Sequence, residues 1–571
     1  MFSLLPYAKA YRKQLILGPL FKFLEAVFEL ILPIQMARLI DNGIRANDWP
    51  TVVKMMVWMV VMSIVGLICA IICQYYASIA SQGFGTDLRN QLLKKINTLS
   101  HDELNQFGTD TLITRMTNDV NQLQLALAML IRLVIRAPFL SVGAIVMAFV
   151  IDWQVGVLFI CILPIFCVVL YWIITRSIPL YKKVQGRLDR LNELVSQNLS
   201  GVRVIRAFAR TNDQRQHFND ATDQLNDVYV KVGNLSALLT PATTLIMNLG
   251  IVGLFYLGGW KVNSGSLQQG ELLALVNYMN QMLLALIVVS NLVLIFTRAA
   301  ASAARINEVL AVEPAIVSPT HPTTESALQG AVAFDHVSFR YGPHYGLALT
   351  DITFEITPNT TVGIIGPTGS GKSTLTQLIP RFYDTSAGTI TLDGQNVQNF
   401  PLDFLRQQIA MVPQTAVLFR GTIRENLQWG KADATDNECW AALKVAQSDD
   451  FVASLPKQLD TVIFEGGKNF SGGQRQRLTI ARAVIAQPAI LILDDSLSAL
   501  DYKTDLALRQ ALQTQPGTVI IISQRVRSIQ EADQILVMDN GHLLAHGTHA
   551  DLLATSGEYR AIVASQEEGV Q

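Results

Sequence analysis

One eight-residue segment, residues 366–373 with the sequence GPTGSGKS, constrains the fold of this chain most strongly. It follows the apolar run 361–365, which we expect to be a buried strand, and precedes a helical stretch that begins near Thr374. A strand, a glycine-rich loop ending in Lys-Ser and a helix form the arrangement of a phosphate-binding loop. The glycines let backbone N–H groups surround a phosphate, and the N-terminal end of the helix faces the same anion. We therefore predict that Lys372 reaches the terminal phosphates of a nucleotide and that Ser373 ligates Mg²⁺.

The first half of the chain differs in composition from the half that holds this loop. Up to about Arg298 it contains long apolar stretches, whereas the remainder has the composition of a soluble domain. A helix that crosses the hydrocarbon core of a bilayer needs about 20 apolar residues. A soluble domain could not bury so many long apolar runs, so we predict membrane-spanning helices. The six expected spans cover residues 15–40, 52–80, 129–151, 153–175, 236–260 and 272–296.

The charges between these spans predict the orientation of the chain. The connections between spans two and three and between spans four and five are long and rich in Lys and Arg, whereas the others are short. By the positive-inside tendency, the long connections and both termini lie in the cytoplasm of a multi-pass protein of the cell membrane. Leucines at helical spacing indicate that the spans continue as helices beyond the bilayer and turn at residues 107–108 and near residues 211–212, which gives short exposed elements there.

Several polar residues interrupt the expected spans. Glu25 and Glu29 lie four residues apart, on one face of the first span. The sixth span carries a rough stripe of amides, formed by Asn277, Asn280, Gln281 and Asn291. Polar groups at membrane depth usually face protein or a water-filled cavity. Two interpretations remain open: these groups line a translocation pathway, or they make interhelical hydrogen bonds and reach toward the interface.

A stretch rich in Pro, Ser and Thr, residues 312–330, separates the two halves. We predict an all-α six-helix transmembrane domain in residues 1–311 and an α/β P-loop ATPase domain in residues 331–571, where strand and helix patterns alternate. The formal net charge is −1, so the chain has no nucleic-acid footprint. We interpret the five cysteines as small buried hydrophobic residues, because no His cluster accompanies them.

Two further motifs lie in the second half. Residues 489–494 (AILILD) form an apolar strand that ends in Asp494. A buried strand that delivers an Asp at its C-terminal end suits the binding of a Mg²⁺–nucleotide complex. Residues 470–474 (FSGGQ) open a helix and form another potential anion site.

Taken together and in this order, these motifs resemble those of a half-size exporter of the ATP-binding cassette (ABC) family, of the type I layout, over essentially the whole chain. The resemblance implies two subunits whose cassettes close head-to-tail around two ATP molecules with Mg²⁺. It implies that Ser373, Gln414 and Asp494 hold the metal. The implied cofactor-binding residues are Tyr341, Gly366, Pro367, Thr368, Gly369, Ser370, Gly371, Lys372, Ser373, Thr374, Gln414, Ser471, Gly472, Gly473, Gln474 and Asp501.

The resemblance also implies individual roles. Tyr341 would stack on the adenine, and Gln414 would sense Mg²⁺ and contact the membrane domain. The signature segment, residues 471–474, would touch the γ-phosphate bound by the opposite subunit. Asp501 belongs to the loop that communicates between the two sites. The turns near residues 107–113 and 211–218 resemble the coupling helices of the family.

Two positions depart from the family pattern. In the family, the general base is a Glu that directly follows the Walker aspartate. Asp494 corresponds to that aspartate here, and the next residue is Asp495 instead of Glu. The second departure is Gln524, which stands where the family has its switch His. The Asp side chain is one methylene shorter, and a displacement of about 1 Å can cost about 100-fold in rate. Gln cannot carry the charge or the proton that His can. With Lys372, these are the predicted catalytic residues, and we expect the chain to bind ATP well but to hydrolyse it slowly in its own site.

These departures resemble the degenerate site of a bacterial heterodimeric multidrug exporter. The expected function is that of an ATP-hydrolysing transmembrane translocase, which exports small amphipathic compounds such as drugs, lipids or small peptides. A second half-transporter would supply the Glu and the His, and the signature segment of this chain would complete that partner's active site. Two alternatives remain: a homodimeric exporter or lipid flippase in which Asp495 still works as the base, and an ATP-gated regulatory membrane protein without net pumping.

Overall fold

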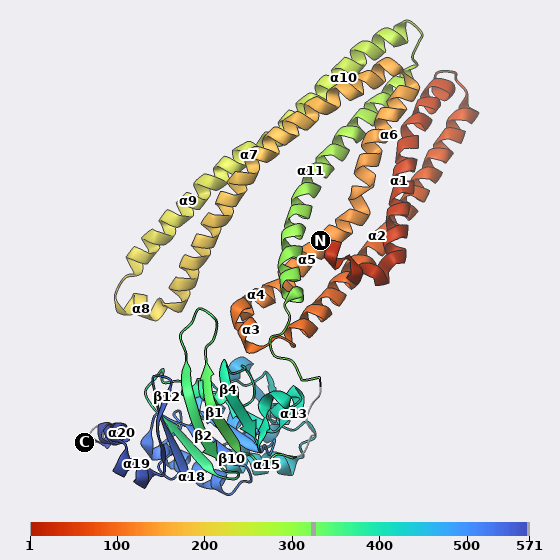
Figure 1. The fold of residues 1–571 in the computed structure, drawn as a ribbon. Helices are drawn as coiled ribbons and strands as arrows, with labels where there is room; N and C mark the ends of the chain where they lie inside the picture. Colours follow the sequence, from red (N-terminus) through yellow and green to blue (C-terminus); the bar gives the residue numbers. More distant parts are fainter. Residues whose placement is uncertain (1, 321–326, 568–571) are drawn as a thin grey trace. The chain divides into compact units, whose positions relative to one another are not determined.

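The computed structural model describes residues 2–320 and 327–567, except the side chains of residues 2, 290, 291, 294 and 567. The chain divides into two compact units (Figure 1). We call Met1–Asn97 with Asp110–Val312 the helical unit, and Thr98–Thr109 with Glu313–Gln571 the α/β unit. An all-α region followed by an α/β region is the predicted fold class, and it is confirmed. Part of the predicted linker, residues 321–326, and the side chain of Asn291 lie outside the described residues.

The helical unit consists of long helices joined by short connections (Figure 1). Helices α2 and α7 each have 48 residues. At about 1.5 Å per residue they are about 72 Å long, which exceeds the roughly 30 Å hydrocarbon core of a bilayer, as predicted. The helices are α1 (Arg12–Arg38), α2 (Trp49–Ile96), α4 (Thr109–Thr114), α5 (Val120–Met129), α6 (Arg136–Ile151), α7 (Trp153–Ser200), α8 (Val202–Ala207), α9 (Thr211–Ala237), α10 (Leu239–Asn263) and α11 (Gln269–Ala311). A 3-10 segment, η1 (Phe2–Tyr11), and three π-helical segments, η2 (Leu39–Ile44), η3 (Arg115–Asp119) and η4 (Leu130–Val134), complete the unit.

Several of these helices are long and apolar enough to cross a membrane, so the chain is a multi-pass membrane protein. Within the described residues there are five such segments: Trp49–Ile96, Thr109–Ile151, Trp153–Ser200, Thr211–Asn263 and Gln269–Val289. The first of the six predicted spans, which corresponds to α1, is not among them. Helix α1 is less apolar because Lys22, Glu25 and Glu29 lie in its middle. The count of six spans stays a prediction.

The two predicted turns have different outcomes. The chain turns at Gly108 (φ +74°), between α3 (His101–Phe107) and α4, as expected. The second turn lies upstream of the expected position, at the short helix α8 and at Ala209 (φ +55°). The prediction of a short element at residues 211–218 is therefore wrong, because these residues begin the 27-residue helix α9.

The core of the helical unit lies where α1, α6, α7, α10 and α11 pack together. Small side chains such as Ala26, Ala144 and Ala148 are fully buried, which lets the helix backbones approach closely. Tyr278 of α11 is also fully buried, and its hydroxyl donates a hydrogen bond of 2.5 Å to the carbonyl oxygen of Leu30 in α1. This bond satisfies the one polar atom of a large side chain in an apolar environment.

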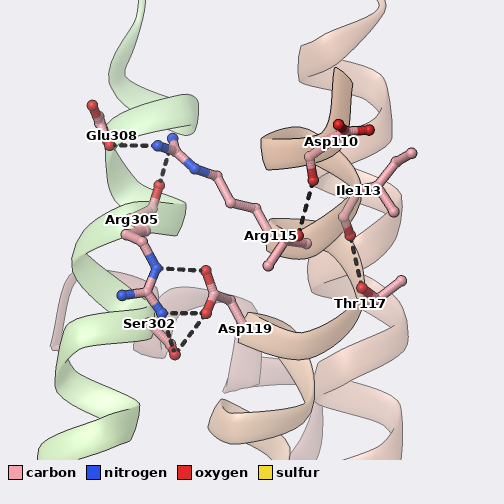
Figure 2. Close-up of polar contacts among 9 residues, drawn as sticks. Asp110, Ile113, Arg115, Thr117, Asp119, Ser302, Arg305 and Glu308 are labelled. Carbon is pink, nitrogen blue, oxygen red and sulfur yellow. Dashed lines mark hydrogen bonds and ion pairs between the residues drawn. The ribbon is translucent and has the colours of Figure 1, made fainter. Parts of the chain in front are cut away.

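A cluster of hydrogen bonds and ion pairs connects the C-terminal part of α11 to η3 (Figure 2). Asp119, whose side chain is 1% exposed, accepts hydrogen bonds from the Ser302 hydroxyl (2.9 Å) and from Nε of Arg305 (2.8 Å). Arg115 donates to the carbonyl oxygen of Arg305 (3.1 Å) and to the carboxylate of Glu308 (2.8 Å). Because each buried charge has a partner of opposite sign, the cluster can sit within the packed helices.

The α/β unit contains a six-stranded sheet with the strand order β12-β11-β3-β10-β9-β6. Neighbouring strands are parallel except β11 and β12. The strands are β3 (Thr361–Ile365), β6 (Ile409–Val412), β9 (Ile490–Asp494), β10 (Thr518–Ile522), β11 (Gln534–Asp539) and β12 (His542–Gly547). Side chains on both faces are buried, since Ile520 and Ile522 of β10 face one core and Val519 and Ile521 face the other.

A second, antiparallel sheet has the order β2-β1-β4-β5, formed by β2 (Leu349–Ile356), β1 (Val332–Phe339), β4 (Ala387–Leu392) and β5 (Gln395–Asn396). The sequence predicts one mainly parallel sheet, but the β1–β2 connection is too short for a crossover and closes a hairpin instead. A two-stranded sheet joins β7 (Gly421–Thr422) and β8 (Val462–Ile463). The helices are α12 (Lys372–Leu378), α13 (Leu402–Gln407), α14 (Ile423–Gln428), α15 (Asp436–Val445), α16 (Asp449–Ala453), α17 (Gly472–Val484), α18 (Tyr502–Gln513), α19 (His549–Thr555) and α20 (Gly557–Glu567), besides α3.

Candidate nucleotide-binding site

The loop of residues 366–373 connects β3 to α12, as the sequence predicts. Gly371 has a φ of +96°, and a Cβ there would lie 2.8 Å from Cδ2 of Leu349 and 2.9 Å from the carbonyl oxygen of Ala348. A Cβ on Gly366 would lie 2.0 Å from the carbonyl oxygen of Met538. Only glycine fits at these two positions, so the loop can keep its backbone close to the neighbouring strands.

Lys372 is folded back onto this loop. Its Nζ donates hydrogen bonds to the carbonyl oxygens of Gly366 (2.9 Å) and Pro367 (2.7 Å), and lies 3.3 Å from the hydroxyl of Ser370. Burial lowers the pKa of Lys372, while the carboxylates of Asp495 and Asp494 act in the opposite direction. The ammonium group is therefore held at the loop where phosphates would bind.

Ser373 and Asp494 meet at the C-terminal end of β9. The Ser373 hydroxyl donates a hydrogen bond of 2.9 Å to Oδ1 of Asp494, which is buried. Burial raises the pKa of Asp494, and the charge of Asp495 adds to this effect, whereas Ser373 and Lys372 oppose it. A hydroxyl beside a buried carboxylate suits Mg²⁺, which prefers oxygen ligands and takes the remainder from water and phosphate.

Asp495 follows directly and adopts a φ of +46°. Its Oδ2 accepts a hydrogen bond of 3.1 Å from Nε2 of Gln414. Burial raises the pKa of Asp495, while Gln414, Lys372 and Arg525 oppose the shift. Asp495 therefore lines the cavity with one of its carboxylate oxygens engaged by Gln414.

Tyr341 lies after the end of β1, and the residue is 40% exposed. Its hydroxyl is 2.8 Å from the hydroxyl of Thr374. The rings of Phe339 and Tyr383 meet it edge-on, at centroid distances of 4.9 and 5.2 Å. These contacts fix the plane of Tyr341 and leave part of the ring free to stack on a base.

A cavity of about 500 Å³ brings most of the predicted residues together. Among them are Tyr341, Thr368, Gly369, Gly371, Lys372, Ser373, Thr374, Gln414, Asp494, Asp495 and Gln524. The sequence analysis missed Leu347, Ala348, Ile522, Asn540 and Gly541, which also line it. The Asn-Gly pair marks the turn between β11 and β12, but only the fold shows that Gly541 N–H donates to the carbonyl oxygen of Ser370 (3.1 Å).

The signature segment and Asp501 do not line this cavity. Ser471 caps α17, accepting from the N–H of Gln474 (3.3 Å), and Asp501 caps α18 through the N–H of Thr504 (3.0 Å). A Cβ on Gly473 would lie 3.3 Å from the carbonyl oxygen of Ala499, so the signature and the segment before Asp501 adjoin each other. The predicted residues therefore form two separate groups within one chain.

Comparisons with known proteins agree with this fold and geometry. The ABC transporter transmembrane region matches residues 15–286, and the ABC transporter domain matches residues 349–498. The chain is 39% identical, over 95% of its length and 94% of the relative, to the ABC transporter ATP-binding protein YfiB of Bacillus subtilis (strain 168). An ATP-binding fold joined to membrane-spanning helices thus defines an ABC-type ATPase of the membrane. This chain belongs to the ABC transporter family.

Other relatives carry more specific names. The chain is 35% identical to YheI of Bacillus subtilis (strain 168), a probable multidrug resistance ABC transporter ATP-binding/permease protein, over 83% of this chain and 81% of the relative. It is 31% identical to an ATP-dependent lipid A-core flippase of Desulfotalea psychrophila (strain LSv54 / DSM 12343), over 83% of each. A solved bacterial Atm1-family ABC exporter with ATP bound has a TM-score of 0.81 and 25% identity, covering 97% of this chain and 98% of that one.

Proposed function

We propose that this chain is one half of a heterodimeric ABC exporter, which moves amphipathic compounds across the cell membrane. ATP would bind in the cavity of the α/β unit, with Tyr341 against the adenine and Lys372 on the terminal phosphates. Ser373, Asp494 and Gln414 would hold Mg²⁺, which neutralises phosphate charge when bound. ATP binding would close two cassettes and switch the membrane helices from an inward-facing to an outward-facing state, with both termini in the cytoplasm.

The observation that supports the asymmetric form is the contrast inside one cavity. Of the predicted loop residues, Thr368, Gly369, Gly371, Lys372, Ser373 and Thr374 line the cavity, yet the two hydrolytic positions hold Asp495 and Gln524. Asp495 would have to accept the proton of the attacking water, but its short carboxylate is hydrogen-bonded to Gln414. Gln524 is neutral and cannot stabilise developing charge as an imidazolium does. We infer that this site holds ATP and hydrolyses it slowly.

The test compares the chain alone with the chain bound to a half-transporter that carries Glu and His at these positions. We expect slow ATP turnover by the chain alone and fast turnover by the pair, with Asp495→Asn leaving the fast rate of the pair nearly unchanged. Mutating the partner's Glu instead should abolish it. Equal turnover in both samples would overturn the heterodimer.

A homodimeric exporter or lipid flippase is the second candidate, favoured by the 31% identity to a protein named as a lipid A-core flippase. In that case Asp495 is the working base. Asp495→Asn would then abolish the turnover of the chain alone, and a purified homodimer would move labelled lipid between the leaflets of a vesicle.

A further inference from the structure

A second cavity lies within the helical unit. Its lining residues come from α1, from η4 and α6, and from α11. Its volume is about 160 Å³. Leu133, Leu140 and Leu284 form part of its apolar wall, and Glu29, Arg136 and Gln281 contribute its polar atoms. At about 30 Å³ per water-sized group, it has room for a polar head group and a few carbons rather than for a whole drug-sized molecule.

Four charged side chains of alternating sign lie in a row, and the last two of them, Arg136 and Glu29, line this cavity. Lys22 Nζ donates to both carboxylate oxygens of Glu25 (2.8 and 2.7 Å), whose Oε1 lies 3.9 Å from Nε of Arg136. Arg136 Nη2 then donates to Oε2 of Glu29 at 2.7 Å. The four charges sum to zero, which lowers the free-energy cost of placing them among apolar helices. Ionisable groups at such positions in a membrane protein usually belong to a functional site.

Two acceptor oxygens of the cavity have no hydrogen-bond partner in the described part of the chain. One buried donor, Nε of Arg136, has none either, but it faces Oε1 of Glu25 at 3.9 Å. Oε1 of Gln281 is buried and has no hydrogen-bond partner in the described part of the chain. Its Nε2 is used, since it donates to the carbonyl oxygen of Glu29 at 3.4 Å. No hydrogen bond described for residues 2–320 and 327–567 reaches Oε1 of Glu29, and a carboxylate can accept several. A ligand that donates hydrogen bonds would satisfy both oxygens.

We propose that this cavity binds the protonated amine end of an amphipathic substrate. The nitrogen donates to Glu29 Oε1 and Gln281 Oε1, and the first carbons lie against Leu133, Leu140 and Leu284. The assignment rests on the proposed export function for its biological meaning and on these side chains for its chemistry. It favours the first of the two interpretations of the polar residues in the membrane helices.

The alternatives fit less well. A carboxylate or phosphate head would face two acceptor oxygens, and the guanidinium of Arg136 already lies beside the carboxylates of Glu29 and Glu25. An alcohol has a single donor, so it could satisfy Glu29 or Gln281 but not both. It also lacks the positive charge that attracts an ammonium group to Glu29, an attraction that is large where water is scarce. An amine supplies both the donors and the charge.

The experiment measures binding without ATP, using the full-length protein in lipid nanodiscs, with empty nanodiscs as the background. The probes are three fluorescent alkyl chains, identical except for an amine, an alcohol or a carboxylate at the free end. We expect the amine to bind about tenfold more tightly than the alcohol, and the carboxylate to bind least. Glu29→Gln should remove that tenfold preference while changing alcohol binding less than twofold.

A second pair of variants keeps the test valid if Glu29→Gln does not fold. Leu284→Trp should narrow the cavity and weaken binding of all three probes at least fivefold. Leu273→Trp is the matched control, because Leu273 is also an exposed leucine of α11 but does not line the cavity. It should leave binding unchanged.

Amine binding that is insensitive to both Glu29→Gln and Leu284→Trp would overturn the site, as would equal binding of the carboxylate. Export is assayed separately, as ATP-dependent accumulation in inverted vesicles. Accumulation together with insensitive binding would reject only the amine site. Sensitive binding without accumulation would uphold the site and reject the export function.

Discussion

The two cavities of this protein are constructed in opposite ways. The nucleotide cavity takes most of its polar groups from one loop and from the ends of neighbouring strands, and its polar side chains have protein partners: Lys372 on loop carbonyls, Ser373 on Asp494. The cavity of the helical unit joins Glu29 to Arg136, 107 residues away, and to Gln281, 252 residues away. There, a buried acceptor is left without a partner in the described chain.

The difference shows what each kind of site can be specific for. A contiguous loop fixes its donors through the backbone, so its ligand chemistry changes little when side chains change. A site assembled from side chains of separate helices depends on packing, and single substitutions can change its preference. Within the nucleotide cavity, Asp495 and Gln524 contribute through their side chains, and we propose that these two side chains limit hydrolysis in this site.

The largest effect is expected from restoring the two hydrolytic side chains. Asp495→Glu combined with Gln524→His should raise ATP turnover in the chain alone by roughly 100-fold, because general base catalysis typically contributes 10²–10⁴-fold. Phosphate release by the purified chain measures this. The control is Asp495→Asn with Gln524→His, which should not gain activity. Unchanged turnover in the restored variant would mean that the departures do not limit the rate.

A smaller loss is expected when Lys372 is removed. Lys372→Ala should weaken ATP binding about 30-fold, since a hydrogen bond to a charged group contributes about 1.5–3 kcal/mol. Equilibrium binding of a fluorescent ATP analogue to the full-length protein measures it. Lys444→Ala, an exposed lysine of α15, is the control and should bind normally. If Lys372→Ala bound ATP as tightly as the parent, the phosphate role of this loop would be wrong.

The adenine contact is expected to be weaker still. Tyr341→Ala should reduce ATP affinity about fivefold, because base–aromatic stacking contributes about 1–3 kcal/mol and the ring is partly solvated. Tyr341→Phe keeps the ring and loses only the hydroxyl beside Thr374, so it should stay within twofold. In competition with the fluorescent analogue, ribose 5-triphosphate, which lacks the base, should bind Tyr341→Ala and the parent equally well.

In the helical unit, the contact between Asp152 and Lys261 should contribute to the stability of the fold but not to ATP hydrolysis. Asp152 caps α7 through the N–H groups of Gln154 and Val155 and also accepts a hydrogen bond from Lys261. Burial raises the pKa of Asp152, but these hydrogen bonds outweigh burial and hold it below its usual value. Asp152→Asn keeps the cap, so it should cost about 1 kcal/mol of stability, the contribution of the lost charge.

The pH dependence of this cost follows from the direction of the shift. A depressed carboxylate pKa stabilises the folded state above the unfolded pKa of about 3.9 and loses that contribution as pH falls through the folded pKa. Thermal midpoints of parent and Asp152→Asn should therefore differ equally at pH 7 and pH 5. The control is Glu193, which forms an exposed ion pair with Arg190. Glu193→Gln should leave the thermal midpoint unchanged at both pH 7 and pH 5. A difference that shrinks between pH 7 and pH 5 would contradict the assigned contact.

Much of the fold and of the nucleotide cavity could be predicted from the sequence. Residues 366–373 and Asp494 were identifiable because a tight phosphate loop and a buried strand impose residue types at fixed spacing. Apolar runs predicted the membrane helices because burial in lipid depends on composition over about 20 residues. These features are local, so no knowledge of packing is needed.

What could not be predicted depends on contacts between distant segments. Asn540 and Gly541 reach the cavity only because β11 lies next to β3. The sequence showed Glu29 and Gln281 as polar residues in apolar helices, but not that Arg136 joins them at one cavity. The position of α8 was missed because left-handed Ala209, which interrupts the helices there, has no sequence signal of its own.

The division of the chain has a mechanical consequence. Thr98–Thr109 belongs to the α/β unit although helical segments of the other unit precede and follow it, so the polypeptide passes between the units three times, at residues 97/98, 109/110 and 312/313. A body attached by a single tether can tumble without pulling on its neighbour. Because α2, α4 and α11 each end at or next to one of these crossings, three covalent connections leave the units fewer independent movements than a single connection would.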